Sequence, residues 1–151
     1  MRVLLATDGS KASSAAVEAL ERLRLDDRDQ IKVISVVDMA VPSAIDIYGG
    51  YLPDTSELEK EAKANAAKVL SESEERLRAF YPERPPQIST ELLFGTPESR
   101  IVETAEEMKA DMIILGSHGY NAWERLLLGS VSNSVVHHAP CSVLVVRAED
   151  K

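Results

Sequence analysis

The amino-acid sequence predicts an α/β protein in which helices cover both faces of an open, five-stranded parallel β-sheet. Two observations lead to this prediction. Short apolar runs alternate along the chain with segments of helical periodicity, an order typical of parallel strands joined by helical crossovers. In addition, the run Met112–Leu115 is uniformly apolar, as expected of a central strand that is buried on both faces. Strand twist makes right-handed crossovers the expected connection.

The first part of the chain indicates two strands and the helix between them. Arg2–Thr7 is a short apolar run and is predicted to be a buried strand. Asp8–Ser10 forms the expected turn, and Ser10 is a suitable N-cap for a helix with apolar residues at helical spacing: Ala15, Ala16, Ala19, Leu20 and Leu23. After a polar break, Ile31–Val37 is rich in β-branched residues and is predicted to be the second strand.

A long connection and a long helix are predicted to follow. Met39–Pro53 contains prolines and glycines, which indicates an irregular loop that is longer than most connections in a compact domain. Loops of this length often act as lids over functional sites, although others are merely mobile. Thr55–Phe80 carries an apolar stripe at helical spacing, and the prolines that follow stop this helix: Pro82, Pro85 and Pro86.

The second half of the chain supplies the remaining elements. Ile88–Phe94 is predicted to be the third strand. Thr96 is the expected N-cap and Pro97 the first residue of the next helix, whose inner face comprises Ile101, Val102, Ala105 and Met108. After the fourth strand, Ser130–His138 is predicted to be a helix and Ser142–Arg147 the fifth strand.

Length and composition indicate one globular domain spanning residues 1–151. The net charge of −8 argues against general nucleic-acid binding, which needs a basic face. No apolar run approaches the about 20 residues of a membrane span, and the N-terminal segment does not resemble a signal peptide. A single cysteine, Cys141, excludes an intrachain disulfide and is expected to be a buried, inert thiol. Together these features predict a cytoplasmic protein.

The segment Gly116–Ser130 combines a strand end, glycines and a helix start, an arrangement that holds anions on backbone N–H groups. Two glycines follow the fourth strand and a third precedes the helix: Gly116, Gly119 and Gly129. In open parallel sheets, ligands bind beyond the carboxyl ends of the strands, where the winding direction reverses. If the first and fourth strands are neighbours, Asp8 faces the same crevice. The sequence therefore predicts a socket for nucleotide phosphates opposite a carboxylate that accepts hydrogen bonds from a ribose or an adenine amine.

The same residues also have purely structural interpretations. Each glycine taken alone serves equally well as a turn residue, and the residue types of Asp8, Ser130 and Ser132 all cap helices. For Asp8 the two roles are compatible. His118 is expected to be exposed to solvent, because no second His, Cys or carboxylate stands at metal-ligand spacing. Arg125 has two interpretations, as a phosphate contact or as a partner of surface carboxylates.

The spacing of the glycines resembles the nucleotide-binding signature of the universal stress protein family. This signature is G-x-x-G, nine residues and then G-S, and here it spans Gly116–Ser130. Three further segments also look like the family, so that the resemblance covers essentially the whole chain: Ala6–Ser10, Gly95–Pro97 and Ala139–Arg147. The resemblance implies a Rossmann-like fold with strand order 3-2-1-4-5, an ATP-binding function and, usually, a dimer.

By this resemblance, an adenine nucleotide would contact several separate parts of the chain. The adenosine would be contacted by Asp8 and the backbone of Val36, and Thr7 would be a further nucleotide-binding residue. The ribose and phosphates would lie along Leu115, Gly116 and Gly119. The phosphates would be bound by Gly129, Ser130, Val131 and Ser132. Mg²⁺ or Mn²⁺ would accompany the nucleotide and would be held mostly by phosphate oxygens.

The fifth strand, Ser142–Arg147, is predicted to form an edge of the sheet. An exposed apolar edge favours aggregation unless it is covered. Two such edges pairing about a two-fold axis would cover each other and produce a homodimer. The alternative is an edge that the C-terminal tail shields.

The first functional hypothesis is a cytoplasmic ATP-binding stress-response protein in which the nucleotide gates binding to a protein partner. The alternatives are a slow ATP hydrolase, a variant that binds AMP or cyclic AMP, and an interaction or holdase module that needs no nucleotide. Catalysis is disfavoured because the sequence lacks the lysine-containing phosphate-binding loop of P-loop enzymes and an evident nucleophile–base pair.

Overall fold

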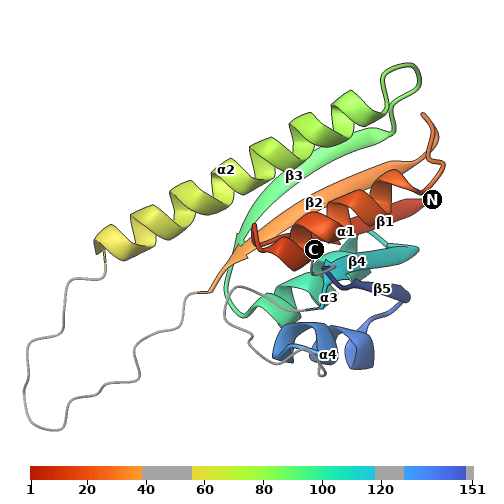
Figure 1. Cartoon of the computed structure of the whole chain (residues 1–151). Helices are drawn as coiled ribbons and strands as arrows, with labels where there is room; N and C mark the ends of the chain where they lie inside the picture. Colours follow the sequence, from red (N-terminus) through yellow and green to blue (C-terminus); the bar gives the residue numbers. More distant parts are fainter. Residues whose placement is uncertain (39–55, 118–127, 149–151) are drawn as a thin grey trace, which may run out of the picture.

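The computed structural model describes residues 1–38, 56–117 and 128–148 of the chain. In these residues, five parallel strands form one sheet in the order β3-β2-β1-β4-β5 (Figure 1). The predicted open parallel sheet with strand order 3-2-1-4-5 is therefore confirmed. Along the chain, the elements are β1 (Arg2–Ala6), α1 (Lys11–Glu21), β2 (Gln30–Val37), α2 (Ser56–Phe80), β3 (Gln87–Phe94), α3 (Pro97–Glu107), β4 (Met112–Gly116), α4 (Ser130–His138) and β5 (Ser142–Val146).

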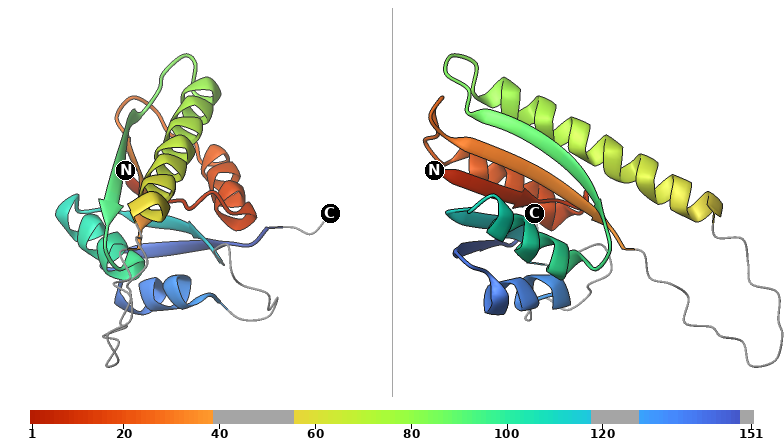
Figure 2. Two further views of the ribbon diagram at one scale, coloured as in Figure 1. Left: turned by 90° about the vertical axis from the view of Figure 1, so that its left-hand side faces the viewer. Right: turned by 180° about the vertical axis from the view of Figure 1, so that it is seen from behind.

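The helices form two layers, with α1 and α2 on one face of the sheet and α3 and α4 on the other (Figure 2). Side chains of β1 and β2 alternate between two apolar clusters, as the period of a strand requires. Leu5 and Val33 pack with α1 and α2, whereas Leu4 and Ile34 pack with α3 and α4. Because β1 lies in the middle of the sheet, it contributes fully buried side chains to both clusters.

Element boundaries differ from the predicted ones by about one residue. The first strand ends at Ala6 and not at Thr7, because the Thr7 hydroxyl bonds to Ser13 (3.2 Å) where the chain turns into α1. The fourth strand extends to Gly116, which pairs with Val146 at the end of β5. The predicted loop at residues 39–53 and the predicted helix start at residue 55 lie outside the described residues.

Two helices begin as the sequence indicates, although by different means. Ser10 caps α1, and its side chain accepts a hydrogen bond from the N–H of Ser13 (3.2 Å). Thr96 occupies the N-cap of α3, but its side chain makes no capping hydrogen bond. Instead, the fixed φ of Pro97 starts the helix, and the Thr96 carbonyl accepts from the N–H of Arg100 (3.0 Å).

The C-terminal end of α2 is anchored to α1. The hydroxyl of Tyr81, just beyond α2, lies within hydrogen-bond distance of the carbonyl oxygens of Leu20 (3.2 Å) and Leu23 (3.1 Å). One turn earlier on the same side, the guanidinium of Arg76 pairs with the carboxylate of Glu21 (2.6 Å). Polar contacts and apolar packing therefore hold this end of α2 in place.

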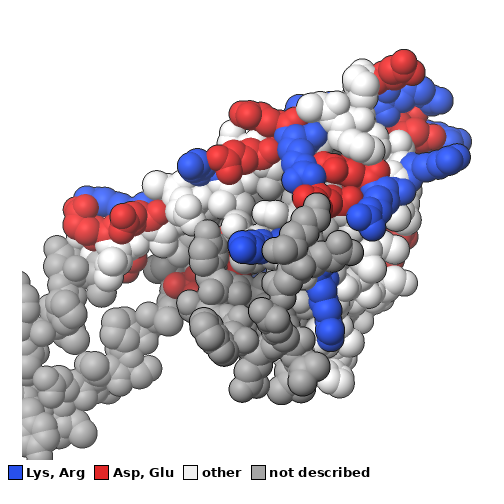
Figure 3. Space-filling view, viewed as in Figure 1, with Lys and Arg blue, Asp and Glu red and all other residues white. Residues whose placement is uncertain are grey.

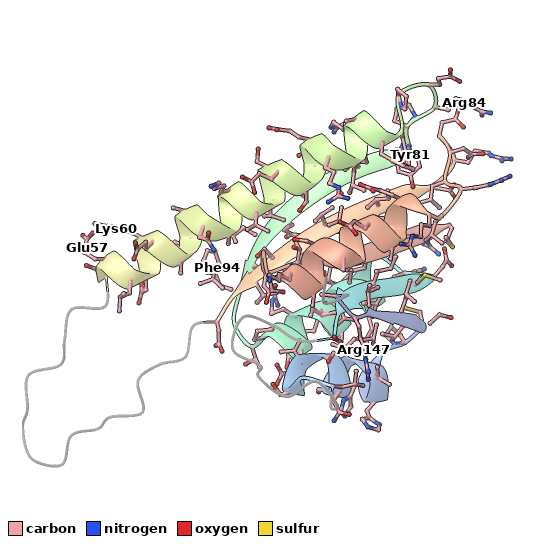
Figure 4. The ribbon with its side chains drawn as sticks, in the orientation of Figure 1. Glu57, Lys60, Tyr81, Arg84, Phe94 and Arg147 are labelled. Atoms are coloured by element: carbon pink, nitrogen blue, oxygen red, sulfur yellow. The ribbon has the colours of Figure 1, made fainter. Side chains whose placement is uncertain are left out.

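The N-terminal half of α2 extends beyond the sheet (Figure 1), with Glu57 and Lys60 at its far end (Figure 4). Ala66 is the first buried residue of the helix. The Nζ of Lys63 lies 5.2 Å from the centre of the Phe94 ring, at the end of β3, in a cation–π contact. This half of α2 therefore overhangs the carboxyl ends of the strands.

Charged side chains of both signs alternate along α2 on the face shown in Figure 3. Three ion pairs within the helix link Lys60 with Glu57 (3.0 Å), Lys68 with Glu72 (3.7 Å) and Arg78 with Glu74 (2.7 Å). Such a mixed surface lacks the basic stripe that binding to nucleic acid requires. Among the described residues, no helix has the length and apolarity needed to cross a membrane.

Candidate functional site

A cavity of about 720 Å³ opens at the carboxyl ends of β1, β2 and β4. The connection after β1 runs over the face that carries α1, whereas the connection after β4 leads to α4 on the opposite face. The winding direction therefore reverses between these two neighbouring strands, which is where open parallel sheets bind their ligands.

The cavity reaches both faces of the sheet. On the side of α1 and α2, it is bordered by Thr7, Ser13 and Ser35, together with small residues of α2. On the side of α3 and α4, its wall is more apolar and includes Ile101 and Leu115. A ligand in this cavity would therefore lie across the strand ends, with a polar wall on one side and an apolar wall on the other.

The N-terminus of α4 points its backbone donors toward the cavity. Gly129 is the N-cap, with φ −61° and ψ 161°, and it offers no side chain to cap the helix. The first helical hydrogen bond runs from the N–H of Asn133 to the Gly129 carbonyl (2.9 Å). The N–H groups of Ser130, Val131 and Ser132 precede this bond and have no partner within the helix. All three residues border the cavity, and such an array of amides is suited to an anion.

The hydroxyl of Ser132 has a structural role. It is 2% exposed and lies within hydrogen-bond distance of the carbonyl oxygens of Ser117 (2.8 Å) and Gly129 (3.0 Å). The N–H of Gly129 also donates to the Ser117 carbonyl (2.8 Å). These bonds join the end of β4 directly to the start of α4. From the sequence alone, Ser132 is either a helix cap or a ligand contact. These hydrogen bonds give its hydroxyl a structural role, so that its backbone N–H is the group that remains for a ligand.

The lack of a side chain at Gly116 is explained by packing against α1. A Cβ atom at this position would lie 2.7 Å from the backbone carbon of Ala12 and 2.8 Å from the backbone nitrogen of Ser13. Gly116 therefore allows α1 to approach β4 closely. Its backbone also borders the cavity, but a ligand is not what occupies the place of its missing side chain.

Asp8 supports the turn into α1 and also borders the cavity. Its Oδ1 accepts a hydrogen bond from the N–H of Ser10 (2.9 Å), which orders the turn into α1. Gly9 makes this turn possible with φ +78°, a left-handed conformation that other residues rarely adopt. The Asp8 side chain is exposed and borders the cavity. The same carboxylate can therefore support the turn and face a ligand.

The structure gathers most of the predicted site residues around one cavity. It is bordered by Thr7, Asp8, Val36, Leu115, Gly116, Gly129, Ser130, Val131 and Ser132. Gly119, His118 and Arg125 lie outside the described residues. Several further lining residues were not predicted from the sequence, among them Ser35, Asp38, Ala62, Asn65, Pro97 and Ile101. Ser35 gave a usable signal, since it is a polar residue within an apolar strand.

The described residues contain no group of three or more His, Cys, Asp and Glu side chains that could hold a metal ion. Cys141 is half-buried, and loss of solvation, followed by the nearby Asp111, raises the pKa of its thiol. A raised pKa lowers the fraction of reactive thiolate at neutral pH. The raised pKa supports the prediction that the Cys141 thiol is inert, which stays a prediction.

Comparisons with known proteins identify the family of this chain and find solved structures with the same fold. The family model described as "Universal stress protein family" matches residues 1–147. A putative universal stress protein of Staphylococcus aureus (strain USA300) is 32% identical over 149 residues, covering 98% of this chain and 84% of the relative. The solved structure of the universal stress protein UspA from Lactobacillus plantarum has a TM-score of 0.73 at 27% identity, covering 97% of each chain.

A further solved structure shares the fold and contains a nucleotide. It is a universal stress protein in complex with cAMP, with a TM-score of 0.65 at 23% identity, covering 99% of this chain and 98% of that one. At this identity, the likeness shows a common fold.

Proposed function

The chain belongs to the universal stress protein family, and from this premise we propose that it binds ATP and acts as a nucleotide-gated regulatory protein. One observation carries the proposal: the N–H groups at the start of α4, which have no partner within the helix, border a large cavity that the Asp8 carboxylate also borders. The related protein that holds cAMP supports an adenine nucleotide as the ligand class.

In this proposal, each part of the nucleotide has its own partners. The phosphates lie at the N-terminus of α4, on the backbone of Gly129, Ser130, Val131 and Ser132. The ribose and phosphates pass Leu115 and Gly116, with Gly119 beyond the described residues. The adenosine lies against Thr7, Asp8 and Val36. A cavity of about 720 Å³ falls within the usual range for small-molecule sites. Mg²⁺ or Mn²⁺ would be held mainly by phosphate oxygens.

We propose binding and regulation as the function, with hydrolysis at most a slow side reaction. Within the described residues, the acidic side chains that border the cavity are Asp8 and Asp38, and neither stands in a pair with a nucleophile. The nucleotide would instead change the equilibrium between surface conformations that a protein partner recognises. We also propose a cytoplasmic location, which the absence of a second cysteine supports.

Titration calorimetry with ATP and Mg²⁺ tests the proposal. We expect saturable binding with one nucleotide per chain and a rise in the unfolding temperature, because a ligand that binds only the folded state stabilises it. AMP, cyclic AMP and GTP in parallel titrations establish the preference. If millimolar ATP produced no heat of binding and no rise in the unfolding temperature, an ATP-binding function would be refuted. Protection of an aggregating client protein without nucleotide would then favour the holdase alternative.

We further propose that two chains pair through β5, which is an edge strand with half-buried apolar residues. The N–H of Ser117 donates to the Val146 carbonyl (2.7 Å), so the backbone of Val146 faces β4. Because successive residues of a strand face opposite ways, the N–H of Val145 points outward, away from the sheet.

Val145→Pro therefore removes an outward N–H without removing a hydrogen bond to β4. We expect this variant to sediment as a monomer at concentrations where the unsubstituted protein and Val145→Ala are dimers. Analytical ultracentrifugation measures the difference. A Val145→Pro protein that remains dimeric would place the interface elsewhere.

A further inference from the structure

The proposed phosphate and ribose contacts leave several polar side chains of the cavity without a role, and two of these lie on the side of α1 and α2 near the expected position of the base. The first is Ser35 of β2, which is 3% exposed and borders the cavity. Its position in the strand places it on the side of α1 and α2, two residues after Val33. Within the described residues, its hydroxyl makes no hydrogen bond, whereas the neighbouring hydroxyls of Thr7 and Ser13 bond to each other (3.2 Å). Because Ser35 Oγ is not among the fully buried atoms that lack a partner, this oxygen opens onto the cavity, where a ligand can hydrogen-bond to it.

The second is Asn65, on the half of α2 that overhangs the strand ends. Asn65 borders the main cavity and also a second cavity of about 300 Å³ between α1 and α2. Its carboxamide makes no hydrogen bond within the described residues. Ala62 and Ala66, which border the main cavity with it, have small apolar side chains that leave room for a flat ring.

These two side chains lie away from the phosphate socket. The socket is at the start of α4, on the α3 and α4 side of the sheet, whereas Ser35 and Asn65 lie on the α2 side. A nucleotide with its phosphates on α4 and its ribose at the ends of β4 and β1 extends its base toward β2 and α2. The base is therefore the part of the ligand that comes near Ser35 and Asn65.

We infer that Asn65 and Ser35 hydrogen-bond the purine and make the site prefer adenine to guanine, an inference that rests on the proposed function. A carboxamide offers one acceptor and two donors on the same edge. Adenine presents a matching amine donor and ring-nitrogen acceptor at N6 and N7, whereas guanine presents two acceptors there, O6 and N7. The Ser35 hydroxyl adds a hydrogen-bond donor or acceptor from strand β2, at the floor of the cavity. Guanine would leave the carboxamide oxygen of Asn65 facing the O6 acceptor.

Calorimetric titration of ATP, GTP and inorganic tripolyphosphate tests the inference with Asn65→Ala, Ser35→Ala and a control. Asn133→Ala makes the same chemical change as Asn65→Ala at an exposed position that does not border the cavity. Asn65→Ala should lower the ATP affinity about 5- to 150-fold and remove most of the preference over GTP. The affinity for tripolyphosphate should not change, since this probe lacks a base.

Ser35→Ala provides a second, independent readout. Removing a hydroxyl that opens onto the cavity and makes no hydrogen bond to the described residues should leave the urea midpoint of the nucleotide-free protein unchanged or raised, while the ATP affinity falls about fivefold or more. If the ratio of the ATP affinity to the GTP affinity were unchanged in both variants, the inference would be overturned, whereas the proposed ATP-binding function would stand. If the unsubstituted protein binds neither nucleotide, the proposed function fails and the inference fails with it. The Asn133→Ala control should match the unsubstituted protein.

Discussion

Gly116→Ala will lower the free energy of unfolding by about 1–3 kcal/mol, and it will do so in the absence of any nucleotide. The added Cβ would lie 2.7 Å from the backbone carbon of Ala12 and 2.9 Å from the Ala12 side chain. These atoms belong to the first turns of α1 and cannot rotate aside as the end of a flexible side chain would. The helix must move away from β4, and the apolar packing beneath it is lost.

Urea unfolding of the nucleotide-free protein measures this effect. Gly129→Ala is the matched control, because Gly129 has φ −61° and ψ 161°, a backbone conformation that alanine adopts readily. Alanine is a poorer N-cap than glycine, and the control should lose no more than about 1 kcal/mol. Equal urea midpoints for Gly116→Ala and the unsubstituted protein would show that Gly116 does not serve the packing of α1.

Ser130→Pro will weaken ATP binding about 10- to 150-fold while leaving the fold intact. The substitution removes one backbone N–H from the start of α4, and a hydrogen bond to a charged group contributes about 1.5–3 kcal/mol. Proline is well tolerated at the first position of a helix. It also requires an extended residue before it, and Gly129 already has this conformation, with ψ 161°.

Ser130→Ala is the control for this experiment, since it removes the hydroxyl and keeps the N–H. Titration calorimetry should give a large loss of ATP and tripolyphosphate affinity for Ser130→Pro and a small one for Ser130→Ala. The free energy of unfolding should change by less than about 1 kcal/mol in the proline variant. If the proline and alanine variants bound ATP equally well, the amides of α4 would not be the phosphate site.

Much of the fold could be predicted because its signals are local. The uniformly apolar strand Met112–Leu115 and the proline start of α3 at Pro97 depend on residues that are close in the sequence. The main site elements were also predictable, since Asp8 lies two residues after the end of one strand and Gly129 directly precedes a helix. Parallel strands end at the same edge, so local signals at two strand ends predicted one shared site.

The features that could not be predicted from the sequence depend on contacts between distant parts of the chain. The sequence placed Gly116 in the predicted nucleotide-binding segment, whereas the place of its missing side chain is next to Ala12 on α1, which no local pattern reveals. The hydroxyl of Ser132 bonds to Ser117 across the whole glycine segment. Asn65 reaches the cavity because α2 overhangs the sheet, and the tertiary packing of that helix determines this position.

The central claim is that the amides at the start of α4 bind the phosphates of ATP. Backbone amide resonances of ¹⁵N-labelled protein, followed during a titration with ATP and Mg²⁺, test it most directly. We predict that the resonances of Ser130, Val131 and Ser132 shift the most and saturate together with the calorimetric binding curve. Saturable ATP binding that left these three resonances unmoved would contradict it.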